Sequence, residues 1–508
     1  MKREKLYPLA IALLGIFVGA MAVVTYNGVI GNRKKLRSEY VSWRKLNLIL
    51  QTVEENYVDS IDYKKVSDAA IVGALAKLDP HSVYMPPVEL EESETDLAGE
   101  FEGVGLQFNV PNDTAVVLEA IPGGPSEKAG VLAGDRILKV DDKVIAGVQF
   151  PQDSMVRRMR GKAGTKVVLT MLRDGETIPF EVTRDKIAQH CVSASFMTGD
   201  TTGYIRLSKF SRTTYEEVHT AVVDLASKGM KKLVFDIRDN TGGFLDQALL
   251  VSNMFLPRGA DIVYMEGLHR KRQDYHADGR GDFQDIALDV LIDDGSASSS
   301  EIFAGAIQDN GRGRIIGRRS FGKGLVQEPV YFSDGSGVRL TVARFYTPSG
   351  RCIQKPYSDD YNYEVYERYG KGEMYSADSM KVENGGILPD VFVPIDTTKA
   401  SKFYIECNRK ATSMRFASAW FDSHKGELQA ISDYGRLLRY LDSAGLEDKF
   451  LSYARTTDGI VPAAGEWPDQ YIMTSVRALV SRYSKLGDNA FYHIYLTIDD
   501  IFKASVKE

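Results

Sequence analysis

The sequence predicts an α+β protein of several domains that begins with a membrane anchor. Its 508 residues correspond to about three domains of ordinary size. Runs with helical periodicity occupy both ends of the chain, whereas short β-branched runs alternate with helical runs in the middle. A hydrophobic content of 44% and a charged content of 26% are ordinary for a globular protein. We therefore expect folded domains along most of the chain.

Charge and cysteine content exclude several kinds of partner. The net charge is −6, and no long basic block lies beyond the N-terminal flank, so nucleic acid is not an expected partner. Cys191, Cys352 and Cys407 are widely spaced and form no metal-binding pattern. An odd number of cysteines cannot form a complete disulfide framework. The sequence thus predicts no resident metal and no cofactor.

Residues 1–30 are predicted to form a signal anchor. Three basic residues precede an uncharged run, residues 6–24, whose length is near the roughly 20 residues needed to span a bilayer. Ala20-Met21-Ala22 has the small-x-small form of a cleavage site, so a cleaved signal peptide is the alternative. Basic residues also flank the other end, which leaves the orientation open. No cysteine lies nearby, which excludes a lipoprotein.

Residues 31–98 are predicted to be a helical region. Leu46, Ile49, Leu50 and Val53 recur at helical spacing. The Pro-containing segment 78–90 is expected to be a connector. His81 lies in it, and we assign it a structural turn role and not a catalytic one.

Residues 99–186 resemble a PDZ domain. The run FEGVGLQF at 101–108 is similar to the loop whose backbone N–H groups bind a terminal carboxylate, and the following strand could pair with an extended peptide. The alternative is a small β domain in which the glycines only form turns. The resemblance implies a loop for the substrate carboxylate and an apolar pocket for its last side chain, made by Gly103, Val104, Gly105, Leu106, Phe108 and Val156.

Residues 187–396 contain the stretch that carries the chemistry. An apolar strand at 287–292 and a turn lead into a helix that starts within a run of serines, and a second strand at 314–317 precedes a lysine flanked by glycines. A serine at a strand–helix junction lies beside unpaired backbone N–H groups, which can stabilise a developing negative charge.

Three interpretations of this stretch are open. Ser298 and Glu301 fit a capping box, in which case the serines only begin a helix. Residues 317–323 match the first seven positions of a phosphate-binding loop, but Gly324 stands where Ser or Thr should hold magnesium, and a strand-like run follows. The third interpretation is a Ser-Lys hydrolase, because a lysine made neutral by burial can deprotonate a serine. None of the seven histidines lies in this stretch.

The third interpretation agrees with a known family, since this sequence resembles the carboxyl-terminal processing peptidases, or tail-specific proteases. The run SASSSE matches the family's nucleophile motif, FGKG follows with its lysine 25 positions after Ser298, and a glutamine lies four residues later. The D-x-R-x-N-x-G-G pattern of the family also occurs, at residues 236–243. The resemblance implies catalytic residues Ser298, Lys323 and Gln327, an oxyanion hole from Gly242, Gly243 and Ser299, and a mixed α/β, crotonase-like core.

The resemblance implies a serine endopeptidase that recognises substrate C-termini through the PDZ domain and processes or degrades exported proteins. It also implies an enzyme anchored to the inner membrane with its body in the periplasm, or exported after signal cleavage, and a homodimer contact in the helical region. It requires no metal and no nucleotide. The competing hypothesis is a non-catalytic PDZ scaffold of the envelope that only binds peptides.

Two further segments complete the chain. Residues 264–283 are polar and contain glycine, so we expect a loop or flap; His269 and His276 lie there beside aspartates, but solvated loops commonly carry such residues and we assign no metal site. Residues 397–508 are predicted to be a helical extension rich in aromatic residues. The sequence leaves open whether this extension is a dimerisation arm or a lid.

Overall fold

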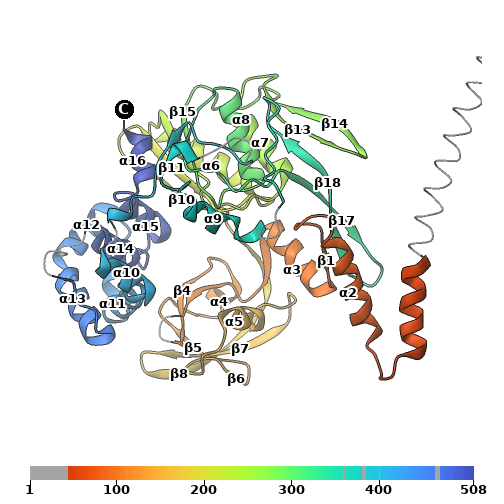
Figure 1. Cartoon of the computed structure of the whole chain (residues 1–508). Coiled ribbons are helices and arrows are strands. Elements are labelled where there is room, and N and C mark those ends of the chain that lie inside the picture. The colour runs from red at the N-terminus through yellow and green to blue at the C-terminus, as the bar shows by residue number, and fades with distance from the viewer. Residues whose placement is uncertain are drawn as a thin grey trace, which may run out of the picture. The chain divides into compact units, whose positions relative to one another are not determined.

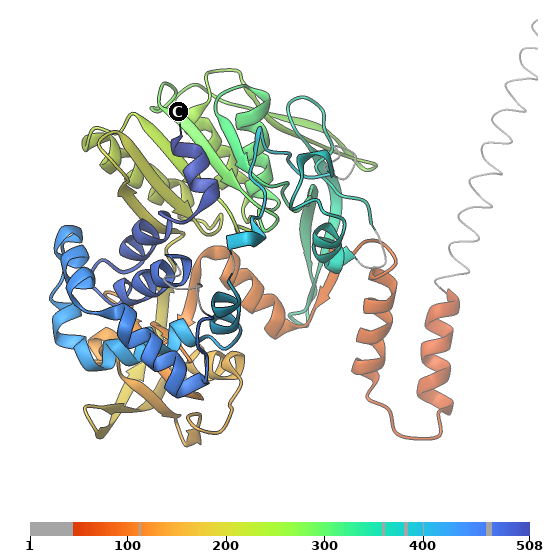
Figure 2. The same cartoon turned by 60° about the vertical axis from the view of Figure 1, so that its left-hand side comes forward.

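The computed structural model describes residues 44–110, 113–357, 361–379, 385–399, 401–463 and 470–507. The chain divides into two compact units, residues 1–84 and residues 85–508, whose elements are labelled in Figure 1 and seen from a second side in Figure 2. The predicted anchor, residues 1–30, lies outside the described residues. Within the described ranges, no helix combines the length and the apolar character needed to cross a membrane.

The described part of the first unit is helical, as predicted. Residues 44–56 form one helix, α2 (Tyr63–Leu75) forms the next, and the short strand β1 (Val83–Met85) follows. The Asp62 carboxylate begins α2 by accepting a hydrogen bond from the Lys65 N–H at 3.2 Å. No side chain of α2 is buried.

The second unit begins with α3 (Pro87–Ala98) and the strand pair β2 (Glu100–Gly103) and β9 (Asp185–Ala188). A small β domain lies between these strands in the sequence. Its sheet has the order β3-β4-β5-β7-β8, with β6 paired to β5, so β3 is an edge strand. These elements are β3 (Leu106–Asn109), β4 (Ala115–Ala120), α4 (Pro125–Lys128), β5 (Arg136–Val140), β6 (Lys143–Val144), α5 (Gln152–Met159), β7 (Lys166–Arg173) and β8 (Glu176–Thr183).

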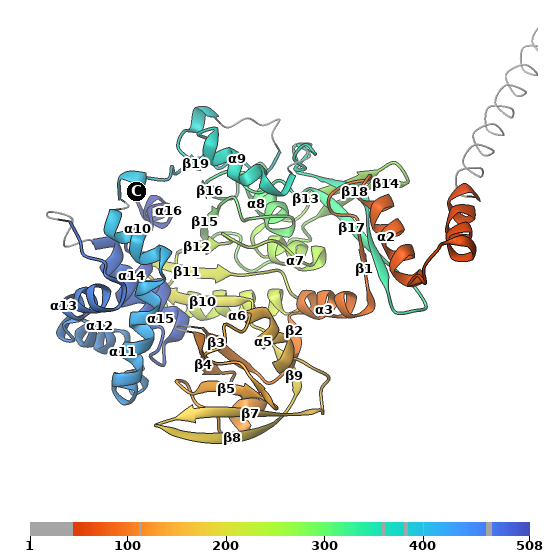
Figure 3. The same ribbon diagram turned by 60° about the horizontal axis from the view of Figure 1, so that its bottom comes forward.

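A six-stranded sheet forms the centre of the second unit. Its strand order is β10-β11-β12-β15-β16-β19, and the labels of these strands follow one another from bottom to top in Figure 3. All neighbouring strands are parallel except β10 and β11. The strands predicted at 287–292 and 314–317 are confirmed as β15 and β16. The strands are β10 (Val192–Met197), β11 (Thr202–Leu207), β12 (Lys232–Asp236), β15 (Ala287–Ile292), β16 (Arg314–Gly317) and β19 (Val391–Phe392).

Three helices pack their apolar faces on this sheet: α6 (Thr214–Ser227), α7 (Leu245–Phe255) and α8 (Ser299–Asp309). Phe303 of α8 lies at the centre of the contact, with its ring centroid 5.2 Å from that of Phe235 and 6.1 Å from that of Phe255. This packing fixes the start of α8, where the serines lie.

A second sheet adjoins the central one. Four of its five strands, β13 (Asp261–Gly267), β14 (Arg270–His276), β17 (Leu325–Tyr331) and β18 (Gly337–Tyr346), pair with one another antiparallel. The prediction of a loop from residue 264 was therefore wrong for residues 264–276, which form the β13–β14 hairpin. Its polar side chains hide the strand period because β14 is almost wholly exposed. Tyr264 holds the hairpin together: its ring stacks on Tyr346 at 4.9 Å and carries the Arg272 guanidinium at 3.7 Å.

In the described residues between β18 and β19, the regular elements are short helices: η2 (Tyr361–Tyr363), α9 (Glu364–Gly370) and η3 (Ala377–Ser379). After β19 the chain is helical in its described residues, which confirms the helical character predicted for the C-terminal extension. The elements are η5 (Thr397–Lys399), α10 (Lys402–Arg409), α11 (Thr412–Gln429), α12 (Tyr434–Ser443), α13 (Leu446–Tyr453), η6 (Ala454–Asp458), α14 (Gln470–Ser481), α15 (Gly487–Tyr495) and α16 (Asp500–Val506).

The C-terminal extension packs within its own chain. Ile501 and Phe502 of α16 join a buried apolar cluster with Tyr204 and other residues of the central sheet. This cluster is separate from the one that contains α6, α7 and α8. Asp499, which caps α16, accepts a hydrogen bond from Arg238 at 2.6 Å. On the small β domain, the Asn109 side chain donates to the Tyr483 hydroxyl at 3.3 Å. The extension therefore contacts both the sheet and the β domain.

Candidate active site

Ser298 lies where β15 turns into α8, and its backbone has an unusual conformation. Its φ is 54° and its ψ is −114°, a region that residues with a side chain seldom adopt. It is the N-cap of α8 and forms the predicted capping box with Glu301. The capping interpretation is thus confirmed as geometry, and it is compatible with a chemical role, because strained backbone conformations cluster at functional sites.

The neighbouring serines are occupied by structural hydrogen bonds. The Ser296 hydroxyl donates to the Ile237 carbonyl at 2.8 Å, that of Ser299 to the Gly243 carbonyl at 2.9 Å, and that of Ser300 to the Asn240 carbonyl at 2.8 Å. These three side chains are buried, whereas Ser298 is half-buried. Ser298 is therefore the serine of this run that a substrate can reach.

Glu301 connects the serine to the lysine, a role that the sequence analysis did not assign. Its side chain is fully buried, and one carboxylate oxygen, Oε2, accepts the N–H of Ser298 and the N–H of Lys323, each at 2.8 Å. The other oxygen accepts the Gly322 N–H at 2.7 Å and the Ser320 hydroxyl at 2.5 Å. Burial raises the pKa of Glu301, while these four donors oppose that effect. The carboxylate thus joins the start of α8 to the loop of Lys323.

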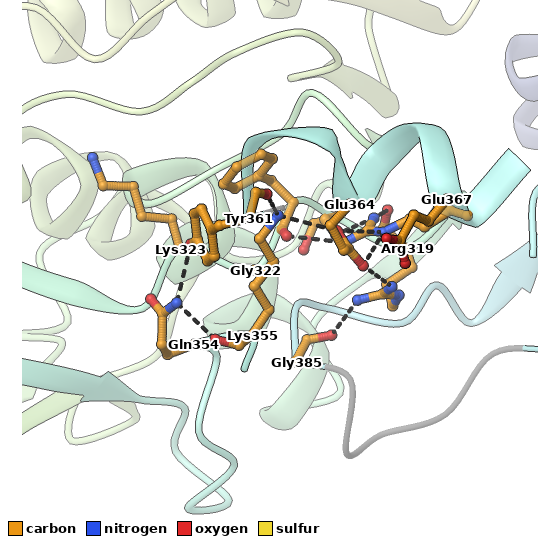
Figure 4. A network of polar contacts seen from close by, with 12 residues as sticks. Arg319, Gly322, Lys323, Gln354, Lys355, Tyr361, Glu364, Glu367 and Gly385 are labelled. Carbon is orange, nitrogen blue, oxygen red and sulfur yellow. Dashed lines mark hydrogen bonds and ion pairs between the residues drawn. The ribbon is translucent and has the colours of Figure 1, made fainter. Parts of the chain in front are cut away.

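Lys323 and Gln327 lie on one continuous segment. Lys323 is half-buried just before β17, and Gln327 is the third residue of that strand, opposite Thr341 of β18. Glycines on both sides of Lys323 allow close packing: a Cβ on Gly324 would lie 2.6 Å from the Gln354 N. In Figure 4 the Lys323 side chain extends away from the polar network drawn beside it.

The phosphate-binding interpretation does not fit this geometry. The N–H groups of Gly322 and Lys323 donate to the Glu301 carboxylate, so they are not available to a phosphate. The segment after Lys323 is the strand β17 and not a helix whose N-terminus could bind an anion.

The two glycines predicted for the oxyanion hole lie against the serine. A Cβ on Gly242 would lie 2.8 Å from the Ser298 Cβ and 2.9 Å from the Ser299 N, and its φ of +99° also favours glycine. The Gly242 N–H donates to the Asn240 side-chain oxygen at 2.9 Å. Among the described residues, the N–H groups of Gly243 and Ser299 have no hydrogen-bond acceptor. These two donors are therefore the ones available to an oxyanion.

A buried charge network holds the strand that leads to these glycines. The Asp236 carboxylate accepts hydrogen bonds from the Tyr204 hydroxyl at 2.7 Å, from Arg206 at 3.1 Å and from Arg238 at 2.6 and 2.9 Å. Burial would raise the pKa of Asp236, but the charges of Arg238 and Arg206 outweigh it and lower that pKa. The sequence contained a signal for this network, the D-x-R pair itself, but not its partners.

The predicted peptide-binding residues lie around the edge strand of the small β domain. Leu106 and Phe108 are on β3 and pack, half-buried, against the domain core. Val104 precedes β3, and its carbonyl accepts the Ser126 N–H and hydroxyl at 3.0 and 2.6 Å. Gly103 is the last residue of β2, and Gly105 has a φ of +73°, which suits the turn between β2 and β3. Val156 lies on α5, where Met155 and Met159 enter the core cluster and Val156 does not.

The described residues contain no cluster of three or more His, Cys, Asp or Glu side chains arranged to hold a metal. His276 of the hairpin bonds Asp261 at 2.6 Å, and His269 is exposed at its turn. The groups that acyl transfer uses, a hydroxyl, an amine and backbone N–H donors, are present in Ser298, Lys323, Gly243 and Ser299.

Comparison with known proteins gives three matches along the chain. Residues 201–363 match the model of Peptidase family S41, residues 103–183 match that of a PDZ domain, and residues 15–87 match one described as the activating protease CtpB N-terminal domain.

Relatives cover most of the chain. A "Carboxy-terminal-processing protease" of Bartonella bacilliformis is 39% identical over 349 residues, which are 67% of this chain and 78% of the relative. A "Probable CtpA-like serine protease" of Staphylococcus saprophyticus is 33% identical over 312 residues, 61% of this chain and 63% of the relative. The solved structure of a photosystem II D1 C-terminal processing protease is 30% identical, with 68% of this chain and 91% of that chain covered and a TM-score of 0.38.

Proposed function

The chain belongs to the carboxy-terminal-processing proteases of Peptidase family S41, and on that premise we propose that Ser298 is its nucleophile and Lys323 its general base. The protein is a serine peptidase that processes proteins at the C-terminus, and it carries a PDZ domain that binds peptide. The observation that carries the assignment is the Glu301 carboxylate oxygen, which accepts the backbone N–H of both residues at 2.8 Å.

In the proposed reaction, the neutral Lys323 amine takes the proton of the Ser298 hydroxyl as its oxygen attacks the substrate carbonyl. The amine of the leaving peptide then takes that proton from Lys323, and the C–N bond breaks to leave an acyl-enzyme. The Lys323 amine then takes a proton from a water molecule as the water oxygen attacks the ester, and it returns this proton to the Ser298 oxygen as the bond to the acyl group breaks. Gln327 would orient Lys323 by a hydrogen bond.

The tetrahedral oxyanion is proposed to lie between the N–H groups of Gly243 and Ser299. Both lack an acceptor within the described residues, whereas the Gly242 N–H already donates to Asn240. Gly242 then serves by its small size, since a side chain there would overlap Ser298. Preorganised donors of this kind typically contribute about a hundredfold or more to kcat.

The PDZ domain is proposed to deliver the substrate. The edge position of β3 supports pairing with an extended peptide, and the loop Gly103-Val104-Gly105 would bind the terminal carboxylate. Leu106, Phe108 and Val156 would contact its last side chain, so we expect apolar C-terminal residues to be preferred.

The following domain limits and location complete the proposal. We assign residues 1–30 to a signal anchor in the inner membrane, 31–98 to a helical region with a homodimer contact, 99–186 to the PDZ domain, 187–396 to the protease core and 397–508 to the helical extension. The enzyme would act on exported proteins in the periplasm of the cell envelope, without metal or nucleotide.

The test is cleavage of an unfolded reporter protein with an apolar C-terminal tail. Wild-type protein should cut it, Ser298→Ala and Lys323→Ala should reduce kcat by at least a thousandfold, and amidation of the tail should raise KM. EDTA should leave the rate unchanged. If Ser298→Ala cuts at the wild-type rate, the nucleophile is another residue. If wild-type protein binds the tail without cutting it, the chain is a peptide-binding scaffold.

A further inference from the structure

The loop that carries Lys323 is held from two sides. This lysine loop, residues 319–324, lies outside any helix or strand, so its backbone polar groups need partners elsewhere in the fold. Its N–H groups from Ser320 to Gly324 donate, in order, to the Ile387 carbonyl (3.1 Å), the Ser296 carbonyl (2.9 Å), Glu301 (2.7 and 2.8 Å) and the Gln354 side chain (3.1 Å).

The carbonyl groups of the lysine loop are bonded by the segment between β18 and β19. The Arg368 guanidinium of α9 donates to the carbonyls of Ser320 at 2.9 Å, of Phe321 at 3.0 Å and of Arg319 at 3.3 Å. The Lys355 N–H donates to the Gly322 carbonyl at 2.9 Å. Four consecutive carbonyls of the loop are thus fixed by two residues of one segment.

Both residues are themselves held rigidly. Arg368 and Lys355 are buried, with 2% and 1% of their surfaces exposed. Glu364 accepts Arg368 Nε at 3.0 Å through one oxygen and Lys355 Nζ at 3.0 Å through the other. The Lys355 amine also lies 3.9 Å from the ring centre of Phe321, a residue of the lysine loop, and 4.2 Å from that of Tyr361. Figure 4 shows Lys355, Tyr361 and Glu364 of this cluster beside Gly322 of the lysine loop.

The charges of the cluster are balanced within it. Burial would raise the pKa of Glu364, but the hydrogen bonds and charges of Arg368 and Lys355 bring it down to about 2. Arg319, the first residue of the loop, pairs with Glu373 and donates to Glu364 at 3.1 Å. A buried charge that loses its partner is costly, so loss of one of these contacts destabilises the others.

Glu364, Arg368 and Glu373 lie beyond residue 363, where the match to Peptidase family S41 ends. None of them was marked by the sequence motifs of the catalytic site.

We propose that Arg368 and Lys355 are positioning residues for the serine–lysine reaction. They fix the carbonyl side of the lysine loop, while Glu301 fixes its N–H side and the serine together. The side chain of Lys323 then extends from a loop whose backbone is fixed. This matters for the rate, because a displacement of about 1 Å in a catalytic group can reduce it a hundredfold. The inference rests on the proposed function, in which Lys323 is the base.

The test substitutes Arg368 by lysine, which keeps the charge, but its three N–H donors lie on one nitrogen and cannot serve the three carbonyls and Glu364 together. Arg312→Lys is the matched control, because Arg312 also donates to three carbonyls of the protease core, those of Phe255, Phe283 and Ile286. With full-length protein and the reporter, Arg368→Lys should lower kcat by about 10- to 100-fold with KM unchanged within twofold. Arg312→Lys should lower the unfolding temperature by a similar amount and change kcat by less than threefold.

A double variant separates positioning from stability. If Arg368 acts through Lys323, then Arg368→Lys should change the residual ester hydrolysis of Lys323→Ala by less than twofold. The proposal is overturned if Arg368→Lys retains kcat within threefold of wild type or if Arg312→Lys loses as much kcat. It is also overturned if Arg368→Lys lowers the residual rate of Lys323→Ala by the same factor as it lowers the wild-type rate.

Glu364→Gln is the second variant, since it weakens the contacts of Arg368 and Lys355 without removing either residue, and the same loss of kcat is expected. If both variants fail to fold while Arg312→Lys folds, the segment is a folding element and the proposal is wrong. If Lys323→Ala cleaves as fast as wild type, it is the proposed function that fails. If Lys323→Ala is inactive and Arg368→Lys is fully active, only the positioning inference fails.

Discussion

Substitution of Glu301 by glutamine should separate serine from lysine while leaving the shape of the buried side chain unchanged. The Glu301 carboxylate is the acceptor in all four of its hydrogen bonds: the donors are the N–H groups of Ser298, Gly322 and Lys323 and the hydroxyl of Ser320. A glutamine offers only one oxygen. Its amide group must face one pair of these donors.

The least costly orientation directs the amide toward Ser320, because a hydroxyl can also accept a hydrogen bond. The Gly322 N–H then loses its acceptor, and the bonds of Ser298 and Lys323 lose their charge assistance. A hydrogen bond to a charged group contributes about 1.5–3 kcal/mol, so Glu301→Gln should lower the free energy of unfolding by about 3 kcal/mol. The lysine loop should shift relative to Ser298, and kcat should fall about a hundredfold.

Glu217→Gln is the control for this prediction. The Glu217 carboxylate also accepts backbone N–H groups, those of Cys191 at 2.9 Å and Val192 at 3.1 Å, but it lies on α6. Thermal unfolding and reporter cleavage are measured for both variants. The reasoning is refuted if Glu301→Gln loses stability but keeps kcat within threefold of wild type, or if Glu217→Gln loses as much kcat.

Three further predictions concern the protease core and the helical extension. Gly242→Ala should reduce kcat about a hundredfold, because its Cβ would lie 2.8 Å from that of Ser298; a rate within threefold of wild type in the reporter assay would contradict this. Burial raises the pKa of Asp293 to about 6, so the stability that this carboxyl contributes is complete below about pH 4 and is lost as the pH rises to 6. Asp293→Asn should abolish this pH dependence of the free energy of unfolding in denaturant titrations, and an unchanged dependence would show that Asp293 is not its source. Burial lowers the pKa of His493 to about 4, so its stabilising contact with Tyr434 is complete above about pH 6.5 and is lost as the pH falls through 4; His493→Phe should remain more stable than wild type at pH 4.5, and equal stability there would contradict the assignment.

The sequence predicted the arrangement around Ser298 well because local chemistry determines it. The β-branched run, the turn and the serine-rich helix start follow from neighbouring residues, and the observed β15 and α8 agree with them. The proximity of Gly242 to the serine was anticipated only through the family pattern, because contacts between distant segments leave no local period.

Contacts made by buried charges were not predictable in this way. Glu301 served in the sequence only to mark the motif, and nothing nearby indicated that its carboxylate binds a loop about 20 residues later. Arg368 lies in the run EVYERYG, which has the composition of an exposed helix, yet its guanidinium is buried against carbonyls 47 to 49 residues earlier. The β13–β14 hairpin was missed because its solvent-facing strand lacks apolar alternation.

The roles of Ser298 and Lys323 are tested most directly by trapping the acyl-enzyme. Reporter and protein are mixed, quenched in acid within one turnover, and digested for mass spectrometry. The proposed mechanism predicts that the N-terminal part of the reporter is ester-linked to Ser298 in wild-type protein and that no adduct forms in Lys323→Ala. An adduct on another residue, or one that forms at the wild-type rate without Lys323, would contradict the Ser-Lys assignment.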